Sequence, residues 1–372
     1  MSRISPALIL LTSALLAGCA PAGGPAPAGG PAPAGGPAPA GGPAPAPSAA
    51  AGFPVQVPDC TGRVTPFDTP ATKIVTSNAA GLEILLRLGA QDQVIGTGFP
   101  PGKGDLPEPL AAAAAKIPSY GGDATGGSMR GISREQLLGS GADTYVEAWG
   151  ALAGMDDVAT PEQLAQVGIR KILLRSTACA PAMNAPQTDL SVLRADISRL
   201  GAVTGRTERA EKIVAEMDAT LSEVASAVAA IPEARRPTVF FFDYDAGTDA
   251  PTTPCNRQVA NAVYTLAGVR NAFADCDDDF TKVGWEEVVK RDPDWIQLAV
   301  RGRGDAVADK KAFDEAENFL TTFAATRELK AVKARRFLRV RSELTTIGGV
   351  RNADTVRAIA AAVHPGLVKA AR

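Results

Sequence analysis

The stretch Thr207–Ile231, with the sequence TERAEKIVAEMDATLSEVASAVAAI, decides the fold of this chain. It carries an apolar residue every three or four positions, as one face of an amphipathic helix does. These apolar residues are Ala210, Ile213, Val214, Met217, Leu221, Val224, Val228 and Ile231. We expect Thr207 to cap the helix and Pro232 to end it, over a length of roughly 37 Å at about 1.5 Å per residue. Because alternating strands and helices are predicted on both sides, we expect one long helix to join two α/β lobes.

The N-terminus is predicted to be an export signal. Arg3 precedes an apolar run at 7–16, and Leu16-Ala17-Gly18-Cys19 resembles a bacterial lipobox. Residues 1–18 would be a lipoprotein signal peptide and Cys19 the lipidated residue, with an ordinary secretory signal as the alternative. Residues 19–52 repeat PAPAGG, which offers nothing to bury, and are expected to be an extended tether. The chain would then be extracytoplasmic and anchored to the cell membrane by its lipid.

Four further cysteines predict two disulfides, because an even count in an exported chain is typical of them. They are Cys60, Cys179, Cys255 and Cys276. Segregation by lobe favours Cys60–Cys179 and Cys255–Cys276, although four cysteines allow three pairings. A metal cluster is the alternative, but the chain has no CxxC spacing and a single histidine, His364, which we expect at a helix end. No metal site or cofactor is predicted, and a net charge of −2 gives no indication of nucleic acid.

Residues 53–185 are predicted to form the first lobe. After a hairpin within 53–67, strands are expected at 73–76, 94–96, 143–147 and 171–174, with helices at 79–88, 111–116, 134–138 and 161–167. Such alternation indicates a mostly parallel sheet covered on both faces, whose ligands bind beyond the carboxyl ends of the strands. The residues at those ends are Ser77, Asn78, Glu147, Trp149, Arg175 and Ser176.

Residues 186–232 are predicted to hold the connecting helices, including the long one, and residues 233–372 the second lobe. Its strands are expected at 238–244, 272–275, 295–300 and 336–340, and its helices at 256–267, 285–290, 311–325 and 352–363. The fold class is therefore α/β, with two Rossmann-like lobes whose mostly parallel sheets are joined by a single long helix.

The two lobes repeat one motif at equal spacing. Glu135 opens a short helix and Asp143 starts a strand eight residues later, as Glu286 and Asp294 do in the second lobe. One copy per lobe indicates a duplicated architecture with both glutamates on the same outer rim. Capping of each short helix by its glutamate is the alternative explanation.

Arginines near the strand ends indicate an anionic ligand, because arginine suits bidentate binding of carboxylate or phosphate. The candidates are Arg301, Arg303, Arg341 and Arg351 in the second lobe and Arg175 in the first. Flat apolar walls for a chelate or ring are expected from Tyr120, Trp149, Tyr244 and Trp285. The alternative is that the arginines are solvated or paired with Glu343 and Asp305.

Catalytic motifs are missing from the sequence. It contains neither GxSxG nor HExxH, and its one histidine precedes a proline. Acid–base chemistry would fall to carboxylates such as Asp243, Asp245 and Asp249, which a turn explains better. We therefore expect a binding protein, with an exported enzyme or a signalling or adhesion lipoprotein as alternatives.

Five stretches, in order, resemble the substrate-binding proteins of bacterial metal-chelate importers, which carry ferric siderophores and cobalamin. They are IVTSNAAGLEILLRLGAQDQVIG, DISRLGAVTGRTERAEKIVAEM, AGVRNAFAD, VGWEEVVKRDPDWI and GGVRNADTVRAIAAAVHP. The resemblance implies two lobes bridged by one long helix, a small-molecule chelate as ligand, and a monomer that meets an ABC permease and its ATPase. It also implies that Glu135 and Glu286 dock into permease arginines. Around Cys60, Cys179 and VGWEEVV the chain is similar as well to an actinobacterial branch thought to bind a phosphorylated precursor of coenzyme F420.

Overall fold

The computed structural model describes residues 52–121, 131–148 and 159–369, all of which belong to one compact unit. The predicted lipidation site Cys19 and the predicted ligand wall Trp149 lie outside the described residues. Among the residues that are described, no helix is both long and apolar enough to cross a membrane.

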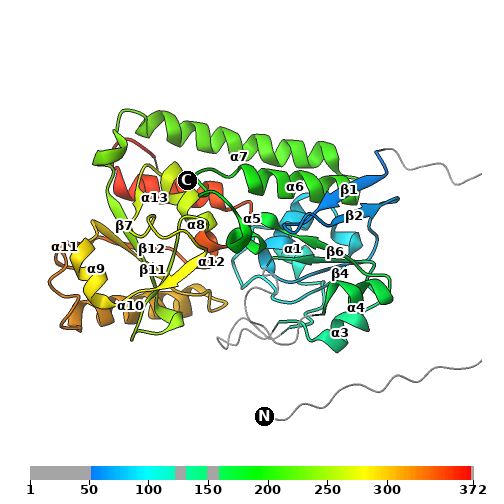
Figure 1. The fold of residues 1–372 in the computed structure, drawn as a ribbon, viewed down its shortest axis with the longest axis horizontal. Helices are drawn as coiled ribbons and strands as arrows, with labels where there is room; N and C mark the ends of the chain where they lie inside the picture. Colours follow the sequence, from blue (N-terminus) through cyan, green and yellow to red (C-terminus); the bar gives the residue numbers. More distant parts are fainter. Residues whose placement is uncertain (1–51, 122–130, 149–158, 370–372) are drawn as a thin grey trace, which may run out of the picture. The chain divides into compact units, whose positions relative to one another are not determined.

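Two four-stranded parallel sheets form the centres of the two lobes (Figure 1). In the first sheet the order is β4 (Val94–Thr97), β3 (Ile74–Thr76), β5 (Thr144–Glu147) and β6 (Arg170–Leu173). In the second it is β9 (Arg270–Asn271), β7 (Thr238–Asp243), β11 (Trp295–Ala299) and β12 (Phe337–Arg339). If the strands of each sheet are numbered in the order in which they occur in the sequence, both sheets have the spatial order 2-1-3-4. The duplicated α/β architecture predicted from the sequence is therefore confirmed.

Two antiparallel pairs lie outside these sheets: β1 (Val55–Pro58) with β2 (Val64–Phe67), and β8 (Thr252–Pro254) with β10 (Phe280–Lys282). The first lobe contains α1 (Ala79–Arg87), α2 (Leu110–Ala114), α3 (Arg134–Leu138), α4 (Pro161–Gln166) and α5 (Arg175–Ala178). The connecting helices are α6 (Ser191–Thr204) and α7 (Thr207–Val228). The second lobe contains α8 (Val259–Leu266), α9 (Trp285–Arg291), α10 (Ala306–Thr322), α11 (Lys330–Lys333), α12 (Glu343–Thr346) and α13 (Asn352–Val363).

The long helix α7 packs on both lobes, against α6 on one side and α13 and α8 on the other (Figure 1). Six of its eight predicted apolar residues are buried, while Val214 and Ile231 are partly buried. They belong to or pack against one continuous hydrophobic core that reaches from Leu82 in the first lobe to Val356 in the second. Two details of the prediction are wrong. Thr207 is the first helical residue and caps nothing, since Arg206 precedes the helix, and the helix ends at Val228 rather than at Ile231.

The aspartates of the repeated motif play the same part in each lobe. Asp143 precedes β5 and accepts hydrogen bonds from the backbone and hydroxyl of Thr72, before β3. Asp294 precedes β11 and accepts the same two bonds from Thr238 at the start of β7. Burial acts to raise the pKa of both carboxyl groups, but these bonds and nearby cations lower it below the usual value. Each aspartate thus joins the first and third strands of its sheet.

The strand predicted at 272–275 is wrong, because β9 stops at Asn271. The side chain of Asn271 accepts a hydrogen bond from the Phe273 backbone, and its carbonyl accepts one from Ala274. These local bonds turn the chain away from the sheet, as asparagine side chains commonly do.

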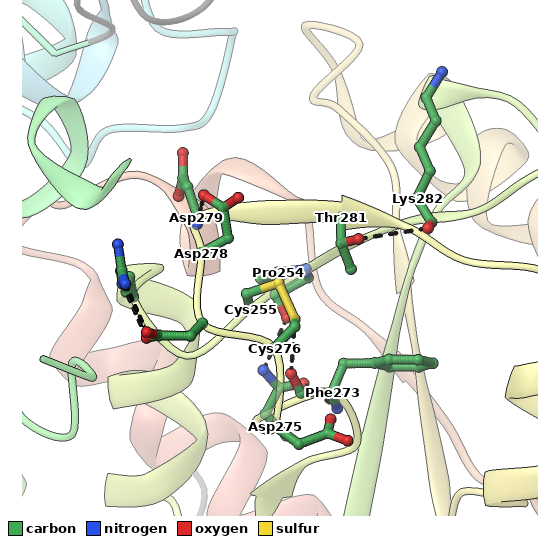
Figure 2. The surroundings of a disulfide bond; sticks show 12 residues. Pro254, Cys255, Phe273, Asp275, Cys276, Asp278, Asp279, Thr281 and Lys282 are labelled. Atoms are coloured by element: carbon green, nitrogen blue, oxygen red, sulfur yellow. Dashed lines mark hydrogen bonds and ion pairs between the residues drawn. A yellow bond between two sulfur atoms is a disulfide. The ribbon is translucent and has the colours of Figure 1, made fainter. Parts of the chain in front are cut away.

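The two disulfides join Cys60 to Cys179 and Cys255 to Cys276, which confirms the favoured pairing. Figure 2 shows the second one between the loop after β8 and the turn before β10. His364, buried at the end of α13 and 3.1 Å from the Gly268 carbonyl, holds that helix against the loop after α8.

Candidate ligand-binding site

A cavity of about 170 Å³ lies between the two lobes. Its lining follows the carboxyl ends of β3 and β4 in the first lobe and of β11 and β12 in the second, the edge at which ligands of parallel sheets bind. The first lobe contributes Asn78, Ala79, Ala80, Glu83, Phe99, Pro100, Gly102 and Asp105. The second lobe contributes Arg301, Gly302, Gly304, Ser342, Glu343, Leu344, Thr346, Ile347, Gly349, Arg351 and Asn352.

Asn78 is positioned by the turn from β3 into α1. Its side-chain oxygen accepts a hydrogen bond of 3.0 Å from the Gly81 backbone and so caps the helix. This bond uses the side-chain oxygen and leaves the amide nitrogen, Nδ2, without a part in the cap. That Nδ2 atom is buried, since the whole residue is only 4% exposed, and it has no hydrogen-bond partner in the described structure.

Glu83 is a buried carboxylate in the middle of helix α1, between the buried apolar residues Leu82 and Ile84. One of its oxygens lies 2.8 Å from Arg87, one turn further along the same helix. The other lies 2.7 Å from the Nε atom of Arg351, which precedes α13 in the second lobe. Glu83 therefore links the two lobes through an ion pair between two residues of the cavity lining.

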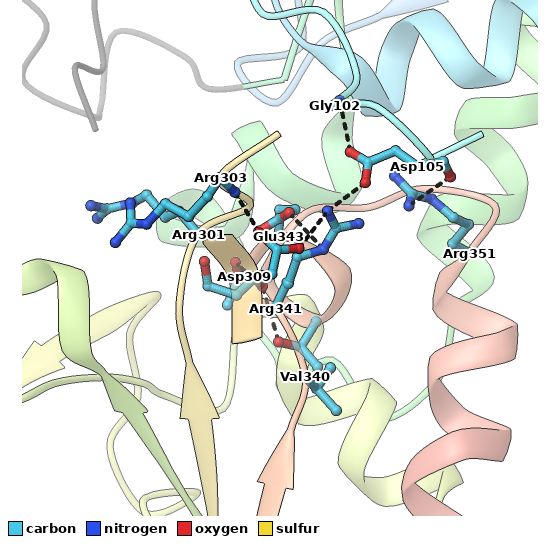
Figure 3. A network of polar contacts seen from close by, with 12 residues as sticks. Gly102, Asp105, Arg301, Arg303, Asp309, Val340, Arg341, Glu343 and Arg351 are labelled. Carbon is cyan, nitrogen blue, oxygen red and sulfur yellow. Dashed lines mark hydrogen bonds and ion pairs between the residues drawn. The ribbon is translucent and has the colours of Figure 1, made fainter. Parts of the chain in front are cut away.

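A loop of the first lobe meets the second lobe through Asp105 (Figure 3). The Asp105 carboxylate accepts a hydrogen bond from the Gly102 backbone and forms an ion pair of 2.5 Å with Arg341. The Lys103 backbone donates to the Gly304 carbonyl at 2.8 Å. These contacts close one side of the cavity.

Two further arginines, Arg301 and Arg303, face carboxylates at the end of β7 and in the loop that follows it. Arg301 lies 3.8 Å from Asp243, and its backbone donates to Asp245 at 2.6 Å. Arg303 forms an ion pair with Asp245. Burial raises the pKa of Asp243, and the Arg301 cation offsets this only in part.

Arg341 contacts three carboxylates: Asp105, Asp309 at 3.5 Å and Glu343 at 3.3 Å (Figure 3). Each of the four second-lobe arginines thus already faces a carboxylate, so they do not form an open cationic surface. Pairing with Glu343 was one of the alternatives, and the structure shows it for Arg341. Pairing with Asp305 is wrong, because that side chain caps α10 through the backbones of Val307 and Ala308.

The structure brings only part of the predicted site together. Asn78, Arg301 and Arg351 line the cavity, and Arg303 and Arg341 belong to the adjoining ion pairs. Ser77 does not line it, because its hydroxyl accepts a bond from the Ala148 backbone and ties β3 to β5.

The predicted aromatic walls and the first-lobe arginine lie elsewhere. Tyr120 packs over Gly96 and donates to the Ile95 carbonyl. Trp285 is buried in the second-lobe core among phenylalanines, with its indole nitrogen donating to the Thr248 carbonyl, and Tyr244 packs against the same cluster. Arg175 starts α5 and is not part of the cavity lining. The aromatic residues serve the core instead.

Three carboxylates of the site were not among the predicted ligand residues: Glu83, Asp105 and Glu343. Glu83 had a signal in the sequence, because a glutamate between Leu82 and Ile84 interrupts an apolar helix. Asp105 had none, since an aspartate in a Gly/Pro-rich loop is ordinary turn chemistry.

Glu135 and Glu286 occupy equivalent places, in the first turns of α3 and α9. Both are exposed, and neither carboxylate has an ion pair in the described part of the chain. Ser133 caps α3 through its hydroxyl, and α9 has no side-chain cap. Neither glutamate is the side-chain cap of its helix, but both lie in the first turn, where the helix dipole also favours a carboxylate.

Two α/β lobes bridged by one helix, with a cavity lined from both sides, define a solute-binding protein of the helix-bridged class. The chain belongs to the periplasmic binding protein family, whose sequence pattern matches residues 74–344. The family's name places it outside the cytoplasm, which agrees with the two disulfides.

Individual relatives are distant. A cobalamin-binding protein of Halobacterium salinarum is 26% identical over 288 residues, which cover 76% of this chain and 69% of the relative. An ABC-type Fe³⁺-hydroxamate transport protein of Saccharomonospora viridis has the same fold, with a TM-score of 0.68, 23% identity, and coverage of 84% of this chain and 99% of that one. A periplasmic binding protein of Veillonella parvula also has this fold, with a TM-score of 0.67 and 24% identity. The match covers 82% of this chain and 95% of that one. These relatives are named as binding or transport proteins, not as enzymes.

Proposed function

We propose that this chain is the substrate-binding component of an ABC importer and that it captures a metal chelate in the interlobe cavity. The observation that carries the proposal is the cavity itself, lined by both lobes at the carboxyl ends of their strands. Cobalamin and Fe³⁺-hydroxamate, the ligands named for two relatives, are both metal chelates. Ferric siderophores and corrinoids are therefore the first ligands to test, and a phosphorylated F420-type precursor is the second.

The size of the cavity sets a condition on binding. Its volume of about 170 Å³ is below the roughly 300–1,000 Å³ usual for drug-sized ligands. A whole chelate would enter only if the lobes part at Asp105–Arg341 and Lys103–Gly304. The described structure thus fits a closed state, in which an anionic ligand group would have to displace a carboxylate from its arginine.

Anchoring and delivery complete the proposal. Cys19 would carry the lipid, and Glu135 and Glu286 would dock onto arginines of the permease, which their exposure and equivalent positions support. The chain would act as a monomer on the outer side of the membrane.

The test is titration calorimetry of purified protein with cyanocobalamin and with a ferric trihydroxamate. We expect one chelate to bind, and we expect Arg301→Ala to weaken it by on the order of 1.5–3 kcal/mol. Arg335→Ala is the control, because Arg335 pairs with Glu317 on the surface and does not line the cavity. No binding of either chelate, or equal binding by the Arg301 variant, would argue against this site.

A further inference from the structure

Within the described residues, two buried polar atoms of the cavity lining have no hydrogen-bond partner. Asn78 contributes the buried Nδ2 donor described above, and Glu343 contributes a buried acceptor, its Oε2 atom. The other oxygen of Glu343 contacts Arg341, so only Oε2 remains unsatisfied. One atom belongs to each lobe, and both residues line the same cavity.

Unpaired buried polar atoms are costly. A buried donor or acceptor without a hydrogen bond destabilises the folded chain, so native structures keep few of them without a reason. Here the cost would be recovered when a ligand fills the cavity. Burial also raises the pKa of Glu343, and the Arg341 cation only partly opposes this, as expected for a carboxylate short of donors.

We propose that Asn78 and Glu343 are the hydrogen-bonding residues that select the ligand, and that the ligand presents an acceptor to Asn78 and an N–H or O–H donor to Glu343. The inference rests on the proposed function and narrows its ligand class. Arg301 and Arg351 supply positive charge to the lining, while Glu83, Asp105 and Glu343 supply negative charge. A chelate that carries only anionic acceptors would leave Glu343 unsatisfied, whereas one with amide, amine or hydroxyl groups satisfies both residues.

The substitutions can be matched to single atoms. Asn78→Asp keeps the oxygen that caps α1 and replaces only the Nδ2 donor, since asparagine and aspartate cap helices about equally well. Glu343→Leu removes both carboxylate oxygens, including the one that contacts Arg341, whereas Glu343→Gln keeps one acceptor oxygen. Glu328→Leu is the control, because Glu328 is exposed and pairs with Lys333 outside the cavity.

Three probes distinguish the ligand classes: cyanocobalamin, which carries carboxamides; a ferric trihydroxamate bearing an ammonium group; and ferric citrate, which offers mainly anionic acceptors. We expect wild type to bind a donor-bearing probe more tightly than ferric citrate. Asn78→Asp and Glu343→Leu should each raise Kd by on the order of tenfold or more, Glu343→Gln by less, and Glu328→Leu not at all. Melting temperatures identify any variant that weakens binding only by misfolding.

The outcomes separate the two proposals. If wild type binds a donor-bearing probe and both Asn78→Asp and Glu343→Leu bind it equally well, this inference is overturned while the proposed function stands. Preference for ferric citrate overturns it as well. If no probe binds wild type, the chelate-binding function fails, and the selection by Asn78 and Glu343 fails with it.

Discussion

Replacing Glu83 by glutamine should reveal how much the buried carboxylate contributes to stability. Glu83 is 2% exposed and contacts both Arg87 and Arg351 at less than 3 Å. Glutamine keeps the shape of the side chain but removes its charge, so two arginines lose their counter-ion at once. One of them, Arg351, belongs to the other lobe.

The magnitude follows from the two contacts. Each attraction is worth about 6 kcal/mol at 2.7–2.8 Å with an effective dielectric constant of about 20, before the cost of desolvation. Removing one partner of a buried ion pair typically costs about 3–5 kcal/mol. Because Arg87 and Arg351 remain 26% and 21% exposed and can recruit water, we expect a loss at or just below the lower end of that range, about 2–3 kcal/mol.

The assay is equilibrium unfolding in urea of wild type, Glu83→Gln and a surface control. Glu328→Gln is the control, since Glu328 lies 2.8 Å from Lys333 with both side chains more than half exposed. Such pairs contribute about 0–1 kcal/mol. Equal losses in the two variants, both below about 1 kcal/mol, would refute the reasoning that burial makes Glu83 important.

The double variant Glu135→Lys/Glu286→Lys should melt and bind its chelate almost normally but fail to support uptake, because charges proposed to meet permease arginines are reversed. Burial and the neighbouring Asp278 charge raise the pKa of Asp279 to about 7. The folded chain therefore favours the protonated carboxyl group, and the stability that this group contributes is complete below the unfolded pKa and is lost as pH rises through 7. Asp279→Asn should therefore gain stability over wild type between pH 5 and pH 8, by on the order of 1–2 kcal/mol once partial exposure is allowed for. Replacing Cys255 and Cys276 by alanine should cost about 3 kcal/mol in urea unfolding, since that disulfide closes a loop of 21 residues.

Each of these expectations has an outcome that contradicts it. Uptake by the double glutamate variant, with the chain present at wild-type levels, would exclude the two glutamates as the docking pair. An unchanged pH dependence of stability in Asp279→Asn would show that the carboxylate is solvated. A loss well under 1 kcal/mol without the Cys255–Cys276 disulfide would indicate that this loop is already ordered in the unfolded chain.

The sequence predicted the fold because its periodic patterns are local. The predicted features act within a few residues or at a strand start, as do the apolar face of Thr207–Val228 and the aspartates Asp143 and Asp294. The failures occurred where one residue redirects the chain. Asn271 ends β9 through its own side chain, which no periodicity reveals.

The site was predicted less well, because its chemistry depends on contacts between distant residues. Strand-end logic located Asn78, Arg301 and Arg351. It could not show that Arg341 meets Asp105, which is 236 residues away in the sequence. The prediction that Trp285 lines the ligand site is not supported, because Trp285 is buried in the second-lobe core. Residue type alone could not distinguish the two places, since tryptophan is common in both.

The continuous core beneath α7 makes the two lobes thermodynamically interdependent. Because apolar side chains of both lobes and of α7 share one cluster, unfolding either lobe would expose the core of the other. Heating should therefore melt the described body in a single cooperative transition. A ligand held at the cavity, present at 100 times its Kd, would stabilise that whole transition by about 2.7 kcal/mol. One melting curve thus reports on any ligand, whichever lobe provides most of its contacts.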